Sequence, residues 1–314
     1  MVRIAYLGPE GTFTDAALMQ ITGAGLVPEQ DTDSGVQRLP IDSTPAALDA
    51  VRDGSADYAC VPIENSIDGS VTPTLDSLSI GSPLQVYAET TLDVAFSIVV
   101  KPGREAGHVR TLAAFPVAVA QVRRWLAANL ADAELRPAYS NADAARQVAD
   151  GQADAAVTSP LAAARWGLSA LADGVVDEPN ACTRFVLIGP PGPPPARTGA
   201  DRTSVVLRID NNPGALVAAL AEFGIRGIDL TRIESRPTRT GLGTYLFFAD
   251  CVGHIDDGAV AEALKALHRR CADVRYLGSW PTGSAVGVAP PPVDEASRWL
   301  AELREGKHEQ RFES

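Results

Sequence analysis

A threonine, an arginine and a phenylalanine stand side by side at Thr183, Arg184 and Phe185, and together they could act on a small anion. The hydroxyl of Thr183 can donate a proton or a hydrogen bond, and the planar guanidinium of Arg184 matches a carboxylate. The apolar run 186–189 follows directly, which predicts a polar loop entering a short buried strand. A strand edge with one solvated arginine would explain the tripeptide alone, so its meaning depends on other motifs.

Two further segments carry polar side chains at comparable places. The first, 8–14, reads Gly-Pro-Glu-Gly-Thr-Phe-Thr, and the second, 61–66, reads Val-Pro-Ile-Glu-Asn-Ser. The glycine spacing in 8–14 differs from that of dinucleotide-binding and phosphate-binding loops, and by itself it indicates only a tight turn. Taken alone, Glu64–Ser66 would equally suit the start of a helix, with Asn65 or Ser66 as its cap.

The elements that position these motifs alternate between strand and helix over the first 190 or so residues. This order is typical of an α/β domain with largely parallel strands. Strands are predicted at 2–7, 37–41, 57–63, 134–138 and 154–158, and helices at 14–21, 43–54, 116–130 and 142–149.

A weak internal repeat indicates two related lobes. Residues 43–62 align without gaps on residues 140–159, with eight of the twenty positions identical. Chance similarity between two amphipathic helix–strand units is the alternative, because small residues inflate such a match. We favour two α/β lobes, the second over about 100–175, with the extended stretch 84–100 crossing to it and the segment 183–189 returning. The predicted fold is a two-lobed clamp like that of periplasmic binding proteins.

The strand directions predict where a ligand binds. In open α/β sheets the crevice lies beyond the carboxyl ends of the strands, where helix N-termini offer free N–H groups. The turn 8–14, the segment Glu64–Ser66 and the pair Thr158 and Ser159 all follow predicted strands. We therefore expect a cleft lined by hydroxyls, an amide and backbone donors, which suits a small polyanion.

Composition narrows the classes of partner. The chain has 314 residues and a formal net charge of −12, so nucleic acid and anionic membranes are poor partners. Neither the four cysteines nor the four histidines have the spacing of a metal site, a redox pair or a catalytic triad. With no apolar stretch of membrane-spanning length and no secretory leader pattern, we expect a cytoplasmic protein.

A proline- and glycine-rich segment, 190–201, predicts a semi-rigid linker before a second domain. Beyond it, Asn212 and Pro213 are expected to cap a helix that carries Leu216, Val217, Leu220 and Phe223 on one face. Strands at 203–209, 228–235, 244–251 and 274–277, with helices at 212–224 and 259–270, give a βαββαβ order, which indicates a ferredoxin-like fold. Residues 281–314 are expected to form a tail with a short helix near 295–304.

Together, the three N-terminal motifs strongly resemble the prephenate dehydratase family over residues 3–189, and residues 203–280 resemble the ACT regulatory domain. The resemblance implies a catalytic domain at 1–189, a linker at 190–201 and an ACT domain at 202–280. Enzymes of this family convert prephenate to phenylpyruvate, water and carbon dioxide without a metal or organic cofactor. The ring carboxylate leaves as the hydroxyl across the ring departs.

The resemblance also implies roles for residues. Thr183 would be the essential hydroxyl that donates to the departing oxygen, and Arg184 would hold a carboxylate or brace the loop. Asn65, the third residue implied in catalysis, would orient the substrate. The residues implied in substrate binding are Glu64, Ser66, Thr12, Gln121, Ser159 and Phe185. Glu64 is unhelpful beside an anion unless it pairs with an arginine or stays protonated.

One segment departs from the family pattern. Members often carry Ser-His-Pro-Gln followed by a distal glutamine, whereas this chain has Ala-Phe-Pro-Val at 114–117. Pro116 and Gln121 are kept, and three polar side chains are lost. A catalytic role for those three positions is therefore in doubt, while the assignment of Thr183 is unaffected.

Two segments resemble the phenylalanine-binding motifs of ACT domains, namely Asn-Pro-Gly-Ala-Leu at 212–216 and Glu-Ser-Arg-Pro at 234–237. Such domains pair side by side and hold the amino acid at their shared interface, which implies a dimer or a dimer of dimers. The implied effector residues are Gly214, Ala215, Leu216, Glu234, Ser235, Arg236 and Pro237.

The sequence therefore predicts a prephenate dehydratase inhibited by L-phenylalanine. An arogenate dehydratase, whose substrate differs only by an amine, is the rival enzyme. A non-catalytic amino-acid sensor built on the same clamp is the rival from another class, and the intact Thr-Arg-Phe motif at 183–185 argues against it.

Overall fold

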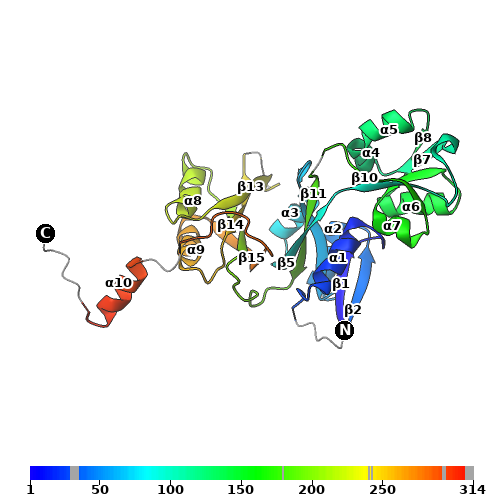
Figure 1. Cartoon of the computed structure of the whole chain (residues 1–314). Helices are drawn as coiled ribbons and strands as arrows, with labels where there is room; N and C mark the ends of the chain where they lie inside the picture. The colour runs from blue at the N-terminus through cyan, green and yellow to red at the C-terminus, as the bar shows by residue number, and fades with distance from the viewer. Residues whose placement is uncertain (29–34, 179, 240, 242, 292–294, 308–314) are drawn as a thin grey trace. The chain divides into compact units, whose positions relative to one another are not determined.

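The computed structural model describes residues 1–28, 35–178, 180–239, 241, 243–291 and 295–307. The chain divides into two compact units, Met1–Pro191 and Gly192–Ser314 (Figure 1). In the described ranges there is no helix with both the length and the apolar character needed to cross a membrane.

The first sheet of the N-terminal unit has the strand order β2-β1-β3-β11-β5. Strand β1 runs parallel to β2 and β3, whereas β11 runs antiparallel to β3 and to β5. The strands are β1 (Val2–Leu7), β2 (Val36–Ile41), β3 (Tyr58–Asn65), β5 (Gln85–Asp93) and β11 (Cys182–Gly189), with the short β4 (Gly69–Ser70) on β3. The helices of this lobe are α1 (Phe13–Gly23), α2 (Thr44–Arg52) and α3 (Thr72–Ser79).

The second sheet has the order β10-β6-β9-β7-β8. Strand β7 is parallel to β8 and β9, while β6 is antiparallel to β9 and β10. The strands are β6 (Phe96–Val100), β7 (Thr111–Ala114), β8 (Glu134–Pro137), β9 (Ala155–Thr158) and β10 (Ser169–Val175). The helices are α4 (Pro116–Gln121), α5 (Arg123–Asn129), α6 (Asn141–Ala149) and α7 (Pro160–Arg165), with a 3₁₀ turn η1 (Ala106–His108).

The internal repeat corresponds to the same structural unit in both lobes. In the first lobe β1 lies between β2 and β3, and in the second β7 lies between β8 and β9. The helices α2 and α6 begin alike, because Ser43 accepts a hydrogen bond from Ala46 N and Ser140 accepts one from Asp143 N. The chain crosses to the second sheet between β5 and β6 and returns at β11, which confirms the two-lobed fold.

Several elements of the second lobe differ from the prediction. The helix expected over 116–130 is two helices, α4 and α5, which are separated by the buried Val122 with φ −126°. Strands β7 and β10 were not predicted: β7 is only four residues long, and β10 is an edge strand with irregular register and no alternating apolar pattern. Helices α3 and α7 and strand β4 also escaped prediction.

The C-terminal unit is a ferredoxin-like fold, as predicted. Its sheet has the order β13-β14-β12-β15, antiparallel throughout. The elements are β12 (Asp201–Arg208), α8 (Ala215–Gly224), β13 (Leu230–Pro237), β14 (Tyr245–Val252), α9 (Gly258–Arg270) and β15 (Asp273–Pro281), followed by α10 (Glu295–Arg304). The core joins both main helices to one face of the sheet, with Phe223 and Leu267 packed in one cluster with Leu207.

The start of α8 differs from the prediction. The helix begins at Ala215 and has no side-chain cap, because Gly214 occupies the N-cap position with φ +80° in the left-handed region. Val217 is 72% exposed and does not belong to the buried face, which instead carries Ala219 and Phe223. The apolar residues at 216 and 217 point in different directions on a helix, so only part of the predicted face is buried.

Candidate active site

The predicted hydroxyl and amide meet on neighbouring strands. In the antiparallel pairing of β3 with β11, Asn65 lies opposite Thr183 and Glu64 lies opposite Arg184. Successive side chains of a strand point to opposite faces of the sheet. The sheet therefore separates the Asn65–Thr183 pair on one face from the Glu64–Arg184 pair on the other.

The orientation of the Asn65 amide is fixed by its neighbours. Its Oδ1 accepts hydrogen bonds from the backbone N–H groups of Ile67 at 2.8 Å and Asp68 at 3.0 Å. The Nδ2 group must then be the side that faces Thr183, and it donates to Thr183 Oγ1 at 2.8 Å. Within the described residues, no acceptor takes the hydroxyl proton of Thr183, so that proton remains available to a ligand.

Ser66 holds the two strand ends together beside this pair. Its Oγ accepts from Cys182 N at 2.9 Å, and its own N–H donates to Cys182 O at 2.9 Å. Both groups of the Cys182 backbone are thus used one residue before Thr183. Ser66 therefore positions the loop, and its own hydroxyl proton has no acceptor in the part of the chain that the structure describes.

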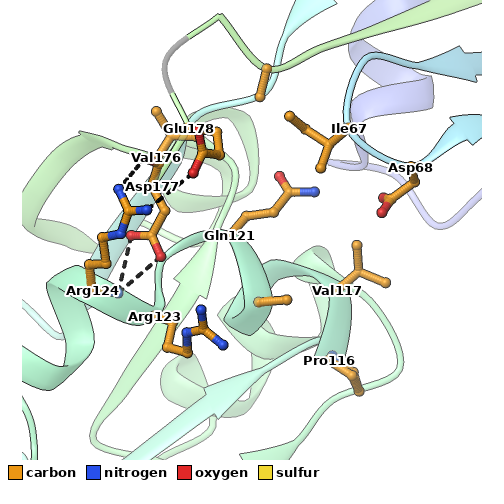
Figure 2. Close-up of a pocket in the computed structure, with 12 residues that line it drawn as sticks. Ile67, Asp68, Pro116, Val117, Gln121, Arg123, Arg124, Val176, Asp177 and Glu178 are labelled. Carbon is orange, nitrogen blue, oxygen red and sulfur yellow. Dashed lines mark hydrogen bonds and ion pairs between the residues drawn. The ribbon is translucent and has the colours of Figure 1, made fainter.

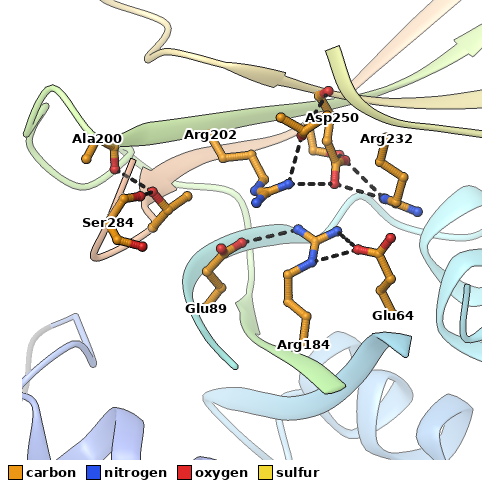
Figure 3. A network of polar contacts seen from close by, with 11 residues as sticks. Glu64, Glu89, Arg184, Ala200, Arg202, Arg232, Asp250 and Ser284 are labelled. Atoms are coloured by element: carbon orange, nitrogen blue, oxygen red, sulfur yellow. Dashed lines mark hydrogen bonds and ion pairs between the residues drawn. The ribbon is translucent and has the colours of Figure 1, made fainter. Parts of the chain in front are cut away.

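Arg184 lies between two carboxylates on the other face of the sheet (Figure 3). Its Nη2 and Nε donate to Glu64 Oε2 at 2.8 and 3.1 Å, and its Nη1 donates to Glu89 Oε2 at 3.2 Å. The Arg184 side chain is 7% exposed and that of Glu89 is 5% exposed. Of the two roles implied for Arg184, this geometry favours bracing the structure over holding a substrate carboxylate. Glu64 is paired with an arginine, which was one of the two conditions expected for an acidic side chain near an anionic substrate.

The turn 8–14 is held by its own hydrogen bonds. Thr12 is the N-cap of α1: its Oγ1 accepts from Asp15 N and donates to Leu7 O. Asp15, which is 3% exposed, accepts from Gly11 N and pairs with Arg38 at 2.7 Å. The Thr12 hydroxyl both donates to and accepts from the backbone, so its role is to stabilise the turn. Its hydroxyl proton is therefore not available to a ligand.

The same turn contacts the second lobe. Ser159, which is 2% exposed, donates to Gly11 O at 2.9 Å while it caps α7 through Ala162 N. Arg165 pairs with Glu10, and this hydrogen bond holds the pKa of the Glu10 carboxyl below its usual range. Ser159 thus joins the two lobes, and its hydroxyl is fully used in doing so.

Two aromatic side chains lie near the turn. Phe13 meets Phe96 of the second lobe edge to face, with ring centroids 5.8 Å apart. Tyr6 is fully buried below the turn, where burial and then the nearby Asp15 raise its pKa to about 12. The hydroxyl of Tyr6 therefore stays protonated at neutral pH.

A pocket of about 480 Å³ adjoins the Asn65–Thr183 pair where the two lobes meet (Figure 2). Neither of those two residues lines it, but the loop that Asn65 holds supplies one wall, and Ala181 lies two residues before Thr183. Gln121 points into the pocket, and its Oε1 is buried without a hydrogen-bond partner in the described chain. The residues around it are Ile67, Asp68, Pro116, Val117, Ala120, Gln121, Arg123, Arg124, Val176, Asp177, Glu178 and Ala181.

Some site residues differ from their predicted roles, and others were missed. Phe185 is 2% exposed in the core with Leu187 and Cys60, so it packs the sheet instead of facing a ligand. Glu89 and Arg123 were not predicted. No local motif marks Glu89 in the sequence, because it comes close to Arg184 only through the pairing of β5 with β11. Two adjacent basic residues close after Gln121, at 123 and 124, were the available signal for Arg123.

The two predicted effector segments lie at one end of the C-terminal sheet. Gly214–Leu216 begin α8 just after β12, and Glu234–Pro237 end β13. Strand β14 separates β13 from β12, with Leu246 paired to Arg236 on one side and to Arg208 on the other. No metal-binding group of three or more histidine, cysteine or acidic side chains occurs among the residues described.

Comparisons with known proteins agree with this architecture. A family model described as prephenate dehydratase matches residues 4–192, and one described as ACT domain matches residues 203–269. A prephenate dehydratase of Mycobacterium tuberculosis (strain H37Rv) is 83% identical over 310 residues, which cover 99% of this chain and 96% of the relative. One of Mycobacterium leprae (strain TN) is 80% identical over 315 residues, covering 100% and 98%.

A solved structure gives the same result for the fold. The prephenate dehydratase of Arthrobacter aurescens in complex with L-Phe has a TM-score of 0.85 and 40% sequence identity to this chain. The alignment covers 97% of this chain and 98% of that one. The match therefore extends over both units.

Proposed function

The chain belongs to the prephenate dehydratase family, and from this premise we propose that it converts prephenate to phenylpyruvate under the control of L-phenylalanine. The observation that carries the catalytic part is the hydrogen bond from Asn65 Nδ2 to Thr183 Oγ1. Because that oxygen accepts from the amide, its own proton points elsewhere and is free to be donated.

The proposed reaction balances without a cofactor. The C–O bond of the ring hydroxyl breaks and its electron pair leaves with the oxygen, which takes up one proton to become water. The bond from the ring to its carboxylate breaks to release carbon dioxide, and that electron pair completes the aromatic ring. Prephenate and one proton thus give phenylpyruvate, water and carbon dioxide.

Thr183 supplies the donor to the departing hydroxyl in this proposal. A threonine is a weak acid in water, so the group that faces its oxygen matters. The Asn65 amide N–H stabilises negative charge that develops on Oγ1 as the proton moves away, as preorganised donors do in other active sites. The backbone N–H groups of Ile67 and Asp68 hold that amide in place from behind.

The regulatory part rests on the C-terminal unit. The Arthrobacter aurescens relative was crystallised with L-Phe, and the ACT family model covers most of the second fold. We propose that L-phenylalanine binds at Gly214–Leu216 and at Glu234–Pro237. The uncapped start of α8, where no side chain satisfies the first N–H groups, suits an amino-acid carboxylate.

We also propose that two copies of the C-terminal unit pair side by side. The strand β13 is an edge strand, and the exposed apolar side chains of this unit include Val217 on α8 and Ile233 on β13. Unpaired edges and exposed apolar groups are features that a partner covers. A homodimer or a dimer of dimers would bring the effector segments of different copies together.

One assay tests the proposed function. Purified protein is incubated with prephenate and, in parallel, with arogenate, and phenylpyruvate and phenylalanine are followed as the respective products, each with and without added L-phenylalanine. We expect phenylpyruvate formation that added L-phenylalanine inhibits. Turnover of arogenate alone would identify the rival enzyme, and binding of L-phenylalanine without any turnover would identify a non-catalytic sensor.

A further inference from the structure

The substrate is a dianion, and the arginine that sequence suggested for it is already neutralised. Arg184 has one carboxylate at 2.8 Å and another at 3.2 Å, on the face of the sheet away from Thr183. Because two carboxylates offset the single charge of this guanidinium, the cluster as a whole has no positive charge to offer a ligand. A different cation must therefore hold at least one carboxylate of the substrate.

The pocket beside Thr183 contains two arginines with different surroundings (Figure 2). Arg124 is engaged, because its Nη2 pairs with Glu178 at 3.2 Å and its Nη1 donates to Asp177 O at 3.2 Å. Arg123 is exposed, and in the described ranges its guanidinium has no hydrogen-bond or ion-pair partner. It is thus the cation of the pocket that remains open to a ligand.

The acidic side chains of the pocket do not pair with Arg123. Both carboxylate oxygens of Asp177 accept from Arg124 N, and Glu178 pairs with the Arg124 side chain. Asp68 is exposed on the opposite wall, next to Ile67. An anion is therefore expected against the wall of Arg123, whereas the Gln121 amide points across the pocket toward Ile67 and Asp68.

The chemistry decides which carboxylate a cation should hold. The ring carboxylate loses its charge as it becomes carbon dioxide, so an ion pair to it would weaken on the way to the transition state and would oppose the reaction. The side-chain carboxylate keeps its charge throughout and remains in phenylpyruvate. An arginine at that group binds substrate without slowing the chemical step.

We propose that Arg123 binds the side-chain carboxylate of the substrate. This inference rests on the proposed function, and it assigns to the second lobe a substrate contact that the motifs of the first lobe do not supply. The residues of the site would then act on different parts of the substrate. Thr183 and Asn65 act on the leaving hydroxyl, while Arg123 holds the end of the substrate that does not react.

The test compares Arg123→Gln with Arg123→Lys and with Arg110→Gln in the full-length protein. Arg110 is an exposed arginine of the second lobe that does not line the pocket, so its replacement changes the net charge equally. We expect Arg123→Gln to raise KM for prephenate by about ten- to a hundredfold, the range for a lost charge-assisted contact, with kcat within about threefold. Arg123→Lys should recover part of the affinity, and Arg110→Gln should change neither constant.

Product inhibition distinguishes the two carboxylates. Phenylpyruvate keeps only the side-chain carboxylate, so Arg123→Gln should weaken its inhibition by the same factor by which KM rises. An unchanged KM, or a raised KM with normal phenylpyruvate inhibition, would overturn the proposal. Calorimetric binding of phenylpyruvate to wild type and Arg123→Gln tests the contact without turnover, so its result stays separate from a failure of the proposed function.

Discussion

Asn65 and Thr183 stand 118 residues apart in the chain, yet the Asn65 amide donates to the Thr183 hydroxyl at 2.8 Å across adjacent antiparallel strands. Because the other side of the amide accepts from two backbone N–H groups, the direction of this hydrogen bond is fixed. The hydroxyl proton of Thr183 is thereby directed away from Asn65. This arrangement turns an ordinary side chain into a directed donor and underlies the first two predictions.

Replacing Thr183 with valine should abolish turnover while the protein stays folded. Valine has nearly the same shape, so the expected loss in kcat, roughly a hundredfold or more, reflects the missing hydroxyl. The matched control is Thr183→Ser, which keeps the hydroxyl and should retain substantial activity. Steady-state kinetics on prephenate measures both, and near-normal kcat for the valine variant would rule out the donor role.

Replacing Asn65 with aspartate separates the two functions of this side chain. A carboxylate still accepts from Ile67 N and Asp68 N, so the loop that borders the pocket should keep its shape. It cannot donate to Thr183 Oγ1, and it would instead accept the hydroxyl proton that the reaction needs. We expect kcat to fall by roughly a hundredfold or more, the scale seen when one preorganised donor is removed. A thermal melt close to that of wild type would show that the fold is intact, and unchanged kcat would contradict the assignment.

Arg184 should behave as a structural residue. Its replacement by glutamine removes the guanidinium that pairs with the buried Glu89 carboxylate, and breaking a buried pair in this way costs about 3–5 kcal/mol of unfolding free energy. The control is Arg146→Gln, which removes exposed pairs with Asp143 and Asp150 and should cost less than about 1 kcal/mol. Urea denaturation measures both variants. A stable Arg184→Gln protein with a greatly raised KM would instead support the role of substrate anchor.

The sequence was sufficient for the main architecture because the signals are local. Strand β1 has the predicted bounds, and the serine caps of α2 and α6 explain why the repeat marks two equivalent units. The pairing of Asn65 with Thr183 was within reach too, since both stand at predicted strand ends. In the second lobe, Gln121 was predicted and points into the pocket, whereas Arg123 was not predicted.

The partners of Arg184 depended on strand register, which no local pattern records. Glu89 lies within an extended run. In the pairing of β5 with β11 it lies opposite Val186, two residues along the strand from Arg184, so the side chains of Glu89 and Arg184 lie on the same face of the sheet. The role of Ser159 was hidden for a similar reason: its acceptor, Gly11 O, belongs to the other lobe. Side-chain roles that depend on contacts between distant segments therefore remained outside the prediction.

Acid should destabilise the C-terminal unit through Glu222. Hydrogen bonds from Arg226 and then Arg270 hold the pKa of this carboxyl below its usual range. A group with a lowered folded pKa contributes stability above its unfolded value, near pH 4.3, and loses it as the pH falls through the folded value. Glu222→Gln should therefore flatten the dependence of stability on pH below about 5. Urea denaturation of both proteins from pH 7 to pH 3.5 measures this, and parallel curves would contradict it.

Removal of the C-terminal unit should separate catalysis from control. The two sheets of the N-terminal unit take all of their strands from residues before Pro191, so a chain ending there keeps the Asn65–Thr183 pair and the pocket. We expect it to convert prephenate and to ignore L-phenylalanine. An effector acts by binding one conformation more tightly than another, a coupling of typically about 1–3 kcal/mol, and that coupling disappears with its site.

A substitution in the full chain tests the same effector site without removing a domain. Gly214→Val places a side chain at the uncapped start of α8, but φ +80° also makes any such substitution strained. Gly199→Val is the matched control, because Gly199 has φ +89° and equally open surroundings but lies outside both effector segments. We expect Gly214→Val alone to lose inhibition by L-phenylalanine while both variants keep activity in its absence. If the truncated chain stayed sensitive to L-phenylalanine, or if both glycine variants lost inhibition alike, the effector would not act through Gly214–Leu216.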